Sequence, residues 1–410
     1  MGETTSCLTN PNAVTRASNT GFCRKGNVVA QSEQQGSVAA ARQPIKVGVL
    51  FDFVFPPAPD EWDFERDFFD AIQLVFDDAH ASGTLDRPVE IVFRAGEGLP
   101  RGSVKSAIDA TRALVDEGCL VIIGPMVSEN AIPIREYLER EGRTPAISWC
   151  GSDDWLGKWS FGLSSGSLPD EPYVLANIVA HAGHRRVGLL VEESLIGEQY
   201  VGFFRRAAKV ESLEIVAEER IFTVDHDLSA TAVRLQAAEP DALVSLGFGF
   251  GVMRLNETLD RLGWHPPRYT GTAWQDAFIS RSVREAYLGW IGLDLYDEEN
   301  PVGAAFLDRF AARYGRRPGY YAPGASRDFA SVVVHALADA KPLSPRGVCR
   351  ALERVKMLPA ASGAPGTRIS YGKWTRRGWM GAGYLVARQF DDVDPTTTHI
   401  RGRLREPKVW

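Results

Sequence analysis

"VIIGPMVSENA", residues 121–131, decides how the rest of this sequence is interpreted. An apolar run with β-branched residues predicts a buried strand, and a Gly-Pro pair ends it. A loop containing Ser128 follows, and the apolar spacing beyond it predicts a helix over residues 132–141. Another apolar run, at residues 144–148, predicts a second strand. Strand, helix and strand in succession indicate a βαβ unit and therefore a parallel sheet.

The same alternation continues on both sides of this unit. The first series has strands predicted at residues 45–51, 89–93, 119–124 and 144–148, with helices at about 64–79, 103–117 and 132–141. The second has strands at residues 186–191, 213–222, 241–247 and 268–272, with helices at about 173–182, 197–209, 231–238 and 253–263. Two such series predict an α/β protein with two doubly wound lobes. Ligands of such sheets bind beyond the carboxyl ends of the strands.

The composition is that of a globular protein with room for two or three domains. The 410 residues are 44% hydrophobic and 24% charged, and the formal net charge is −6. No basic stripe or polybasic segment stands out, so we expect no nucleic-acid partner. No apolar run is long enough to span a bilayer, so we expect no direct membrane insertion.

Five cysteines lie at positions 7, 23, 119, 150 and 349. They form no C-x-x-C pair and no Cys/His cluster at zinc spacing, so we predict no metal site and no cofactor. The odd count favours free thiols and a reducing compartment. Residues 1–43 are poor in large apolar side chains and are predicted to be a flexible extension. They contain no readable signal peptide and no lipoprotein signal.

Two glycine-rich motifs have competing interpretations. "GLSSG" (162–166) matches the nucleophile elbow of hydrolases, but only a weak strand precedes it and Pro169 intervenes before the next helix. A hinge between the lobes explains these small residues better. "GFGFG" (247–251) lacks the full spacing of a dinucleotide-binding loop, so a tight turn is the preferred interpretation.

Ser128 and Ser152 each follow a predicted strand closely. Their hydroxyls, with free amides at a helix start, suit a carboxylate or another polar head. The alternative is that Ser128 only caps its helix, with Asn130 as a rival cap. Aromatic side chains crowd the same loops, and they predict a concave, largely apolar ligand site. They include Phe53, Trp149, Phe248 and Trp274.

One long stretch carries a family resemblance. "TRALVDEGCLVIIGPMVSENAIPIREYLEREGRTPAISW" (111–149) resembles the first-lobe signature of type I periplasmic binding proteins, specifically the branched-chain amino acid and amide receptor group of ABC-transporter solute-binding proteins. "HRRVGLLVEESLIGEQYVGFFRRAAK", "EPDALVSLGFG", "RYTGTAW" and "GYYAPGASRDFASVVVHAL" match the family in order and spacing. The resemblance covers about residues 45–390.

This resemblance implies two Rossmann-like lobes that are joined by three hinge crossings and close over a ligand. The crossings fall near residues 160–165, 292–294 and 369–373. Lobe 1 is then predicted to comprise residues 44–163 and 293–369, and lobe 2 residues 164–292 and 370–410.

The resemblance also implies site residues. A serine in the G-P-x-x-S loop holds the ligand carboxylate in amino-acid receptors, and that position is Ser128. In the loop after the "P-x-I-S" strand, a backbone carbonyl and a Ser or Thr contact the ligand, and these positions are Cys150 and Ser152. Aromatic positions of the second lobe fall near Ile196 and Phe248. The acid that pairs with a ligand ammonium falls near Ala273 or Trp274. The complete predicted set is Phe53, Ser128, Trp149, Cys150, Gly151, Ser152, Ile196, Phe248 and Trp274.

Departures from the family pattern shape the expected ligand. Ile196 replaces a common tyrosine, and Ala273-Trp274 replaces the acid, although Gln275 and Asp276 lie close by. A buried ammonium without a carboxylate is costly. We therefore expect a ligand with a polar or carboxylate head and an apolar body, such as an aromatic, fatty or sterol-derived acid, or an amide.

The resemblance favours non-catalytic binding for an ABC importer, whose permease is the expected partner. Such receptors are usually exported, whereas the lack of a readable signal and the odd cysteine count favour the alternative of a cytoplasmic sensor of the amide-receptor type. A third hypothesis, from another class, is a serine hydrolase that uses Ser164 or Ser165.

Overall fold

The computed structural model describes residues 42–53, 63–99, 101–222, 225, 227–249, 251–278, 281–318 and 322–405. Nearly all of the extension predicted over residues 1–43 lies outside the described residues. So do most of the loop after the first strand and the two tyrosines of the "GYYAPG" motif. Residues 43–410 form one unit, to which the following elements belong.

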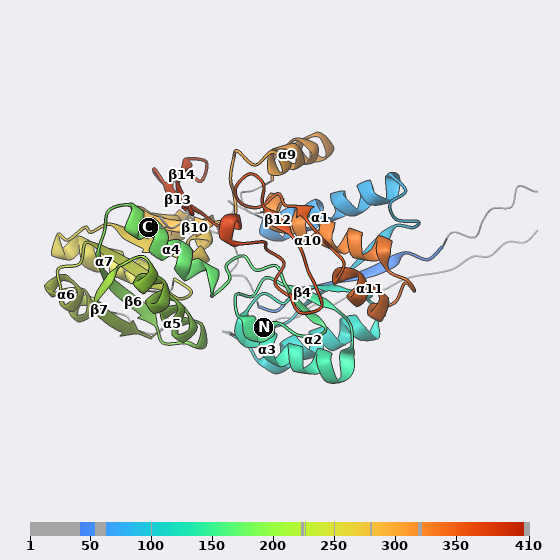
Figure 1. The fold of residues 1–410 in the computed structure, drawn as a ribbon, viewed down its shortest axis with the longest axis horizontal. Coiled ribbons are helices and arrows are strands. Elements are labelled where there is room, and N and C mark those ends of the chain that lie inside the picture. Colours follow the sequence, from blue (N-terminus) through green and yellow to red (C-terminus); the bar gives the residue numbers. More distant parts are fainter. Residues whose placement is uncertain are drawn as a thin grey trace, which may run out of the picture. The chain divides into compact units, whose positions relative to one another are not determined.

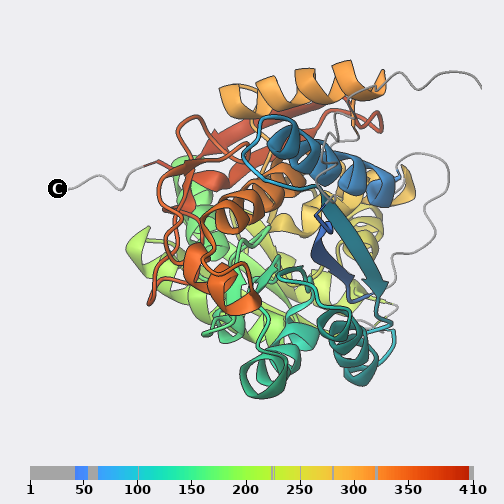
Figure 2. The same cartoon turned by 90° about the vertical axis from the view of Figure 1, so that its right-hand side faces the viewer.

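Five parallel strands form the first sheet, in the order β2-β1-β3-β4-β5. They are β1 (Ile45–Phe51), β2 (Val89–Ala95), β3 (Ile122–Ile123), β4 (Ala146–Ser148) and β5 (Ser160–Gly162). The helices of this lobe are α1 (Phe64–Ala81), α2 (Val104–Asp116), α3 (Ser128–Tyr137), α9 (Pro301–Tyr314), α10 (Ala322–Asp339) and α11 (Pro345–Leu352). Helix α10 runs beside α1, although the two are far apart in sequence (Figure 2).

Seven strands form the second sheet, in the order β14-β13-β10-β9-β8-β6-β7. The parallel strands are β6 (Arg186–Glu192), β7 (Glu214–Ile221), β8 (Ala242–Leu246), β9 (Arg268–Thr270) and β10 (Trp290–Asp294), and β13 (Val386–Phe390) and β14 (Thr398–Arg403) are antiparallel additions at one edge. The helices are α4 (Asp170–His181), α5 (Leu195–Val210), α6 (Ser229–Ala237), α7 (Val252–Leu262) and α8 (Arg281–Tyr287), with the short 3₁₀ helix η3 (Thr272–Phe278). Figure 1 shows β6 and β7 among α5, α6 and α7.

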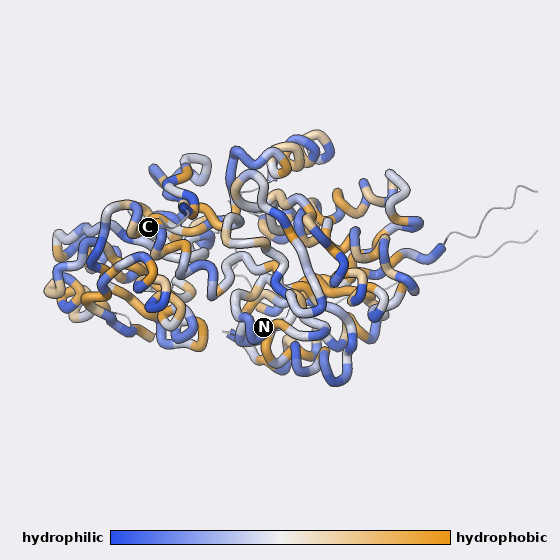
Figure 3. Tube along the Cα trace, viewed as in Figure 1, coloured by the Kyte–Doolittle hydropathy of each residue, from blue (hydrophilic) through white to orange (hydrophobic). Residues whose placement is uncertain are grey.

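Burial explains why these segments form sheets that are covered on both faces. Every residue of β8 is buried, and β6 is buried from Val187 onward. Near-continuous apolar strands of this kind are typical of parallel sheets between helices. Figure 3 maps the hydropathy of these segments along the chain. The two doubly wound lobes predicted from the sequence are confirmed.

The described chain passes between the two lobes in three places. These are the segment from β5 to α4, the segment from β10 to α9, and the segment from the small β11–β12 pair (Leu358–Pro359 and Arg368–Ile369) to β13. The exact lobe boundaries stay predictions, because the strand and helix ends do not define where one lobe stops. The hinge interpretation of "GLSSG" fits the first passage.

Some predicted element bounds were wrong. Helix α3 begins at Ser128 rather than at residue 132, so Ser128 belongs to the helix and not to the loop. The regular part of β3 is only Ile122–Ile123, and Cys119 does not belong to the strand because its amide is still bonded to the preceding helix at Leu114. Strand β10 and the β13–β14 hairpin were not predicted at all.

Candidate functional site

A cavity lies where the carboxyl ends of strands from both sheets meet. Its empty volume is about 1010 Å³, including the open solvent at its mouth. Loops after β1, β3 and β4 form one side, and loops after β6, β8 and β9 form the other, as expected for parallel sheets. The lining residues are Phe53, Phe64, Met126, Val127, Ser128, Trp149, Gly151, Ser165, Gly166, Leu168, Ile196, Tyr200, Gly247, Phe248, Thr272, Ala273, Gln275 and Asp276.

Asp52, directly after β1, organises the lobe-1 wall. Its buried carboxylate accepts hydrogen bonds from the amides of Met126 (2.5 Å) and Val127 (3.1 Å) and from Nδ2 of Asn130 (2.9 Å). Burial raises the pKa of Asp52 to about 6, and these donors oppose the shift. The carboxylate therefore holds the loop that leads into Ser128.

Ser128 is the first residue of α3, and its hydroxyl accepts a hydrogen bond from the Ser152 amide (3.3 Å). The residue in the N-cap position is Val127, and no side chain caps this helix. The Asn130 side chain is bonded to Asp52 and to the Leu99 backbone instead. Both capping alternatives are therefore wrong. The first amides of a helix have no intrahelical acceptor, so Ser128 presents a hydroxyl beside a helix N-terminus that suits an anion.

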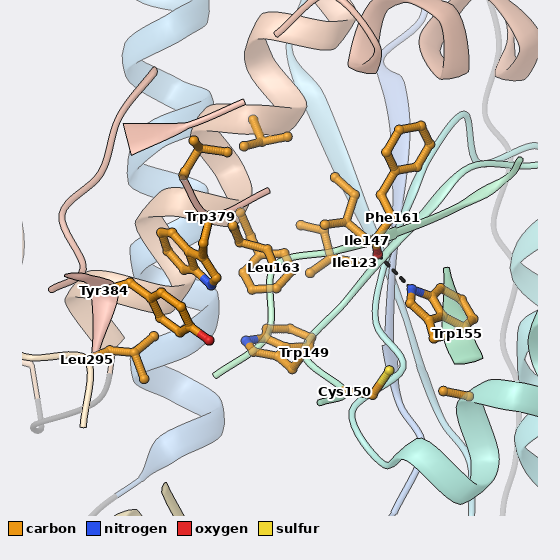
Figure 4. Packing of buried hydrophobic residues seen from close by; sticks show 14 of the residues in the cluster. Ile123, Ile147, Trp149, Cys150, Trp155, Phe161, Leu163, Leu295, Trp379 and Tyr384 are labelled. Carbon is orange, nitrogen blue, oxygen red and sulfur yellow. Dashed lines mark hydrogen bonds between the residues drawn. The ribbon is translucent and has the colours of Figure 1, made fainter. Parts of the chain in front are cut away.

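The loop after β4 divides between the cavity and the interior. Trp149 and Gly151 line the cavity, and the Trp149 ring packs against Phe329 with a centroid separation of 4.2 Å. Cys150 and Ser152 do not line it. The Cys150 thiol lies among buried side chains (Figure 4), and this burial raises its pKa to about 12. The Ser152 hydroxyl caps the short helix η2 (Asp153–Trp155). The resemblance implied a ligand contact through the Cys150 backbone carbonyl and the Ser152 side chain, but neither residue lines the cavity.

The other wall contains the predicted Ile196 at the start of α5 and Phe248 after β8. The amides of Phe248 and Gly251 donate to the carboxylate of Glu192 (2.6 and 3.4 Å). A carboxylate of the protein already occupies the donors of the "GFGFG" loop, so this loop does not offer these amides to a phosphate. Phe53, the remaining predicted aromatic of the first lobe, also lines the cavity.

Trp274 does not line the cavity, contrary to the prediction. Its ring is fully buried and packs against Phe278 and Phe390, with centroid separations of 5.6 and 4.5 Å. The reason is the 3₁₀ geometry of η3, in which residues i and i+3 lie on the same face. Ala273 and Asp276 share the cavity face, while Trp274 anchors the helix in the core.

Asp276 is the acid that the sequence argument placed outside the site. Its side chain is exposed to the cavity and makes no hydrogen bond or ion pair with another described residue. The protein around the cleft limits its hydration and, with the charge of Glu192, raises the pKa of Asp276 to about 7. The signal that identifies it is the three-residue spacing from Ala273, once η3 is known to be a 3₁₀ helix.

The hydrolase hypothesis finds no geometric support. β5 ends at Gly162 and α4 begins only at Asp170, so no sharp strand-to-helix turn presents a nucleophile. Ser164 is buried, and its carbonyl accepts a hydrogen bond from Nε1 of Trp379 (2.8 Å). Ser165 lines the cavity, but no histidine is among the described lining residues.

Other sequence expectations can be compared with the described residues. Cys119, Cys150 and Cys349 are buried free thiols. No group of three or more potential metal ligands occurs in the described part of the chain. No helix there is both long and apolar enough to cross a membrane.

Two doubly wound lobes with a cavity at the facing strand ends define a hinged, two-lobed binding protein. The chain belongs to the periplasmic binding protein family, whose model matches residues 44–382. Solved structures of type I members share the fold. No curated protein matches the sequence significantly.

Three of these structures illustrate the likeness. A type I periplasmic binding protein from Bordetella pertussis is 18% identical, with a TM-score of 0.72, 88% of this chain covered and 100% of that one. The branched-chain amino acid transporter substrate-binding protein LivJ from Streptococcus pneumoniae, in complex with isoleucine, is 18% identical with a TM-score of 0.70 over 88% and 100% of the two chains. The leucine-binding protein LivK from Thermotoga maritima is 18% identical with a TM-score of 0.71 over 89% and 100%. At these identities the likeness establishes the fold alone.

Proposed function

We propose that this chain is the solute-binding component of an ABC importer and that it binds a small ligand without transforming it. The ligand carries an ammonium and a carboxylate on an apolar or aromatic body, as an apolar amino acid does. The observation that carries this proposal is Asp276, a carboxylate that faces the same cavity as Ser128 and has no hydrogen bond or ion pair with another described residue.

The two walls suit the two charges of such a ligand. Ser128 and the N-terminus of α3 offer a hydroxyl and amide donors to a carboxylate. Asp276 offers the counter-charge without which a desolvated ammonium is costly. Between them, the aromatic rings of Phe53, Trp149 and Phe248 suit an apolar body.

This proposal replaces the ligand expected from the sequence, an acid or amide without an ammonium, with an amino acid. A fatty or aromatic acid without an amine would meet the carboxylate of Asp276, and no lysine, arginine or histidine is among the described lining residues. Like charges in a partly desolvated site repel each other. An amine on the ligand turns this repulsion into attraction. The apolar body and the carboxylate anchor of the earlier expectation are kept.

A thermal-shift comparison tests the proposal. The probes are L-phenylalanine and L-leucine, their deaminated analogues hydrocinnamate and isocaproate, and their decarboxylated analogues phenethylamine and isoamylamine. A ligand that binds only the folded state raises the melting temperature by mass action. We expect the largest shift with an amino acid and the smallest with the acids. Equal or larger shifts with the deaminated acids would overturn the proposal.

A further inference from the structure

Glu171, the second residue of α4, is a buried acid that the proposed ligand contacts do not include. Its side chain is fully buried, and one carboxylate oxygen accepts a hydrogen bond from the Thr272 amide. The other oxygen, Oε2, is buried without a hydrogen-bond partner among the described residues. No arginine, lysine or histidine of the described chain pairs with it.

Two glycines bring this carboxyl group next to the cavity. A methyl group on Gly166, which lines the cavity, would lie 2.5 Å from Cδ of Glu171. A methyl group on Gly271 would lie 2.8 Å from its Oε1 and 3.1 Å from the hydroxyl of Tyr200, another lining residue. The Glu171 carboxyl group therefore lies directly against Gly166, a residue that lines the cavity.

The hydrogen bond to Thr272 connects Glu171 with Asp276. Thr272 is the first residue of η3, and Asp276 lies on the same short helix. The middle of η3 is held by the buried Trp274 and by a hydrogen bond from Gln275 to Asp294 (3.1 Å). Glu171 is the contact that fixes its beginning.

Burying the ionised Glu171 carboxylate lowers the stability of the ligand-free protein. Burial raises the pKa of Glu171 to about 7, hydrogen bonds from Thr272 oppose the shift, and the neighbouring Asp170 adds to it. A neutral side chain could fill the space without this cost. Arg377, which lies beside Asp170, pairs with Asp170 and Asp153 and not with Glu171.

We infer that Glu171 is a positioning residue that holds the Asp276 helix and adds a second negative charge behind the wall where the ligand amine binds. This inference rests on the proposed function and deepens it, because it assigns the amine to a wall with two acids. In this proposal, the ligand ammonium compensates the negative charges of Asp276 and Glu171.

Ligand affinity should depend on pH if both acids bind the ligand ammonium. The groups that face Glu171 are Asp170 on α4, Tyr200 on α5, Thr272 on η3 and Tyr384 from the third passage, and none of them is a cation. Glu192 and Tyr287 face Asp276. A bound ammonium favours the ionised form of both acids, so binding below their ligand-free pKa values releases protons. Ligand affinity therefore rises as the pH rises toward about 7 and levels off above it.

Calorimetric titration of Glu171→Gln tests this inference. Glutamine keeps the size of the side chain and an oxygen for Thr272, but removes the charge. Affinity for the amino-acid probe with the largest thermal shift is measured between about pH 5.5 and 8.5, in buffers of different ionisation enthalpy that reveal proton release. The matched control is Glu214→Gln, at an exposed acid paired with Arg186.

We expect Glu171→Gln to bind the amino acid about three- to tenfold more weakly at high pH and to release about one proton fewer at low pH. Neither its ligand-free melting temperature nor its affinity for the deaminated analogue should fall. Glu171→Asp keeps the charge but withdraws it from Thr272, so we expect it to keep the proton release and lose affinity. Wild-type affinity and proton release in Glu171→Gln would overturn the inference and leave the proposed function standing. A wild-type protein that shows no preference for the amine would overturn the proposed function itself.

Discussion

The two walls of the cavity differ in how their acids are satisfied. On the lobe-1 wall, Asp52 accepts three hydrogen bonds, from two backbone amides and Asn130. On the lobe-2 wall, Asp276 has no partner in the described chain, and one oxygen of Glu171 has none. The Asp52 carboxylate is therefore satisfied within the described chain, whereas the Asp276 carboxylate is not. Glu129, next to Ser128, also has one buried oxygen without a described partner, so the contrast holds for Asp52 and Asp276 alone. This difference between Asp52 and Asp276 is the reason why we assign the ligand ammonium to the lobe-2 wall.

The largest effect is expected from Asp52→Asn, which disrupts the hydrogen bonds of the lobe-1 wall. Asp52→Asn places an amide group against the donors of Met126 and Val127 and leaves at least one of them unsatisfied. We expect the free energy of unfolding to fall by about 1–3 kcal/mol. Ligand affinity should fall as well, because the loop before Ser128 loses its anchor. Chemical denaturation and calorimetric titration measure the two effects.

The control for this change is Asp86→Asn, at an exposed acid that pairs with Arg87. It should leave both stability and affinity as they are. If Asp52→Asn unfolds like the wild-type protein, the account of the lobe-1 wall is wrong.

Ser128→Ala should have the next largest effect. It removes the hydroxyl that we assign to the ligand carboxylate, and hydrogen bonds to charged groups contribute about 1.5–3 kcal/mol. We expect about a tenfold or greater loss of affinity for the amino acid, and little loss for the decarboxylated amine. An equal loss for both ligands would show that Ser128 supports the wall without contacting the carboxylate.

The pH dependence of stability should differ between empty and loaded protein. The pKa values of Asp52, Glu171 and Asp276 are raised to about 6, 7 and 7. Groups with raised values contribute stability that is fully present below their unfolded pKa values and is lost as the pH rises through the folded ones. The melting temperature of the ligand-free protein should therefore fall between about pH 4 and 7 and level off above about pH 7.

A saturating amino-acid ligand should reduce this fall, because its ammonium favours the ionised forms of Asp276 and Glu171. Calorimetric scans with and without ligand measure the gap, which we expect to widen with rising pH. A gap that narrows toward high pH contradicts the assignment of the amine to these acids.

The smallest effect on affinity is expected from the aromatic residues. Phe248→Leu removes a ring that lines the cavity, and we expect a loss of less than about tenfold. Trp274→Phe changes a ring in the core, so it should lower the melting temperature and leave affinity unchanged. If Trp274→Phe weakens binding more than Phe248→Leu, the orientation of η3 is wrong.

The same contrast shows what the sequence could predict. Apolar runs and helical spacing predicted the alternation of strands and helices, and strand ends predicted the cavity positions of Phe53, Ser128, Trp149, Ile196 and Phe248. These depend on patterns that are local in the chain. Ser128 was placed correctly at the cavity even though its helix begins earlier than predicted.

The errors come from geometry that the sequence does not reveal locally. The helical phase of η3 decides that Asp276, not Trp274, faces the cavity, and a 3₁₀ turn cannot be recognised from seven residues. Cys150 and Ser152 were assigned from the family resemblance, but the Cys150 thiol is buried and the Ser152 hydroxyl caps a short helix, and neither residue lines the cavity. Glu171 is separated from Thr272 by a long stretch of chain, so no spacing pattern connects them.

The most direct test measures the coupling between Asp276 and the ligand amine. Calorimetric titration of the wild-type protein and of Asp276→Asn, each with the amino-acid probe and its deaminated analogue, isolates the coupling between the carboxylate and the amine. We predict that the wild-type protein prefers the amino acid by about tenfold or more and that Asp276→Asn loses this preference. An equal preference in both proteins would contradict the claim that Asp276 binds the ligand amine.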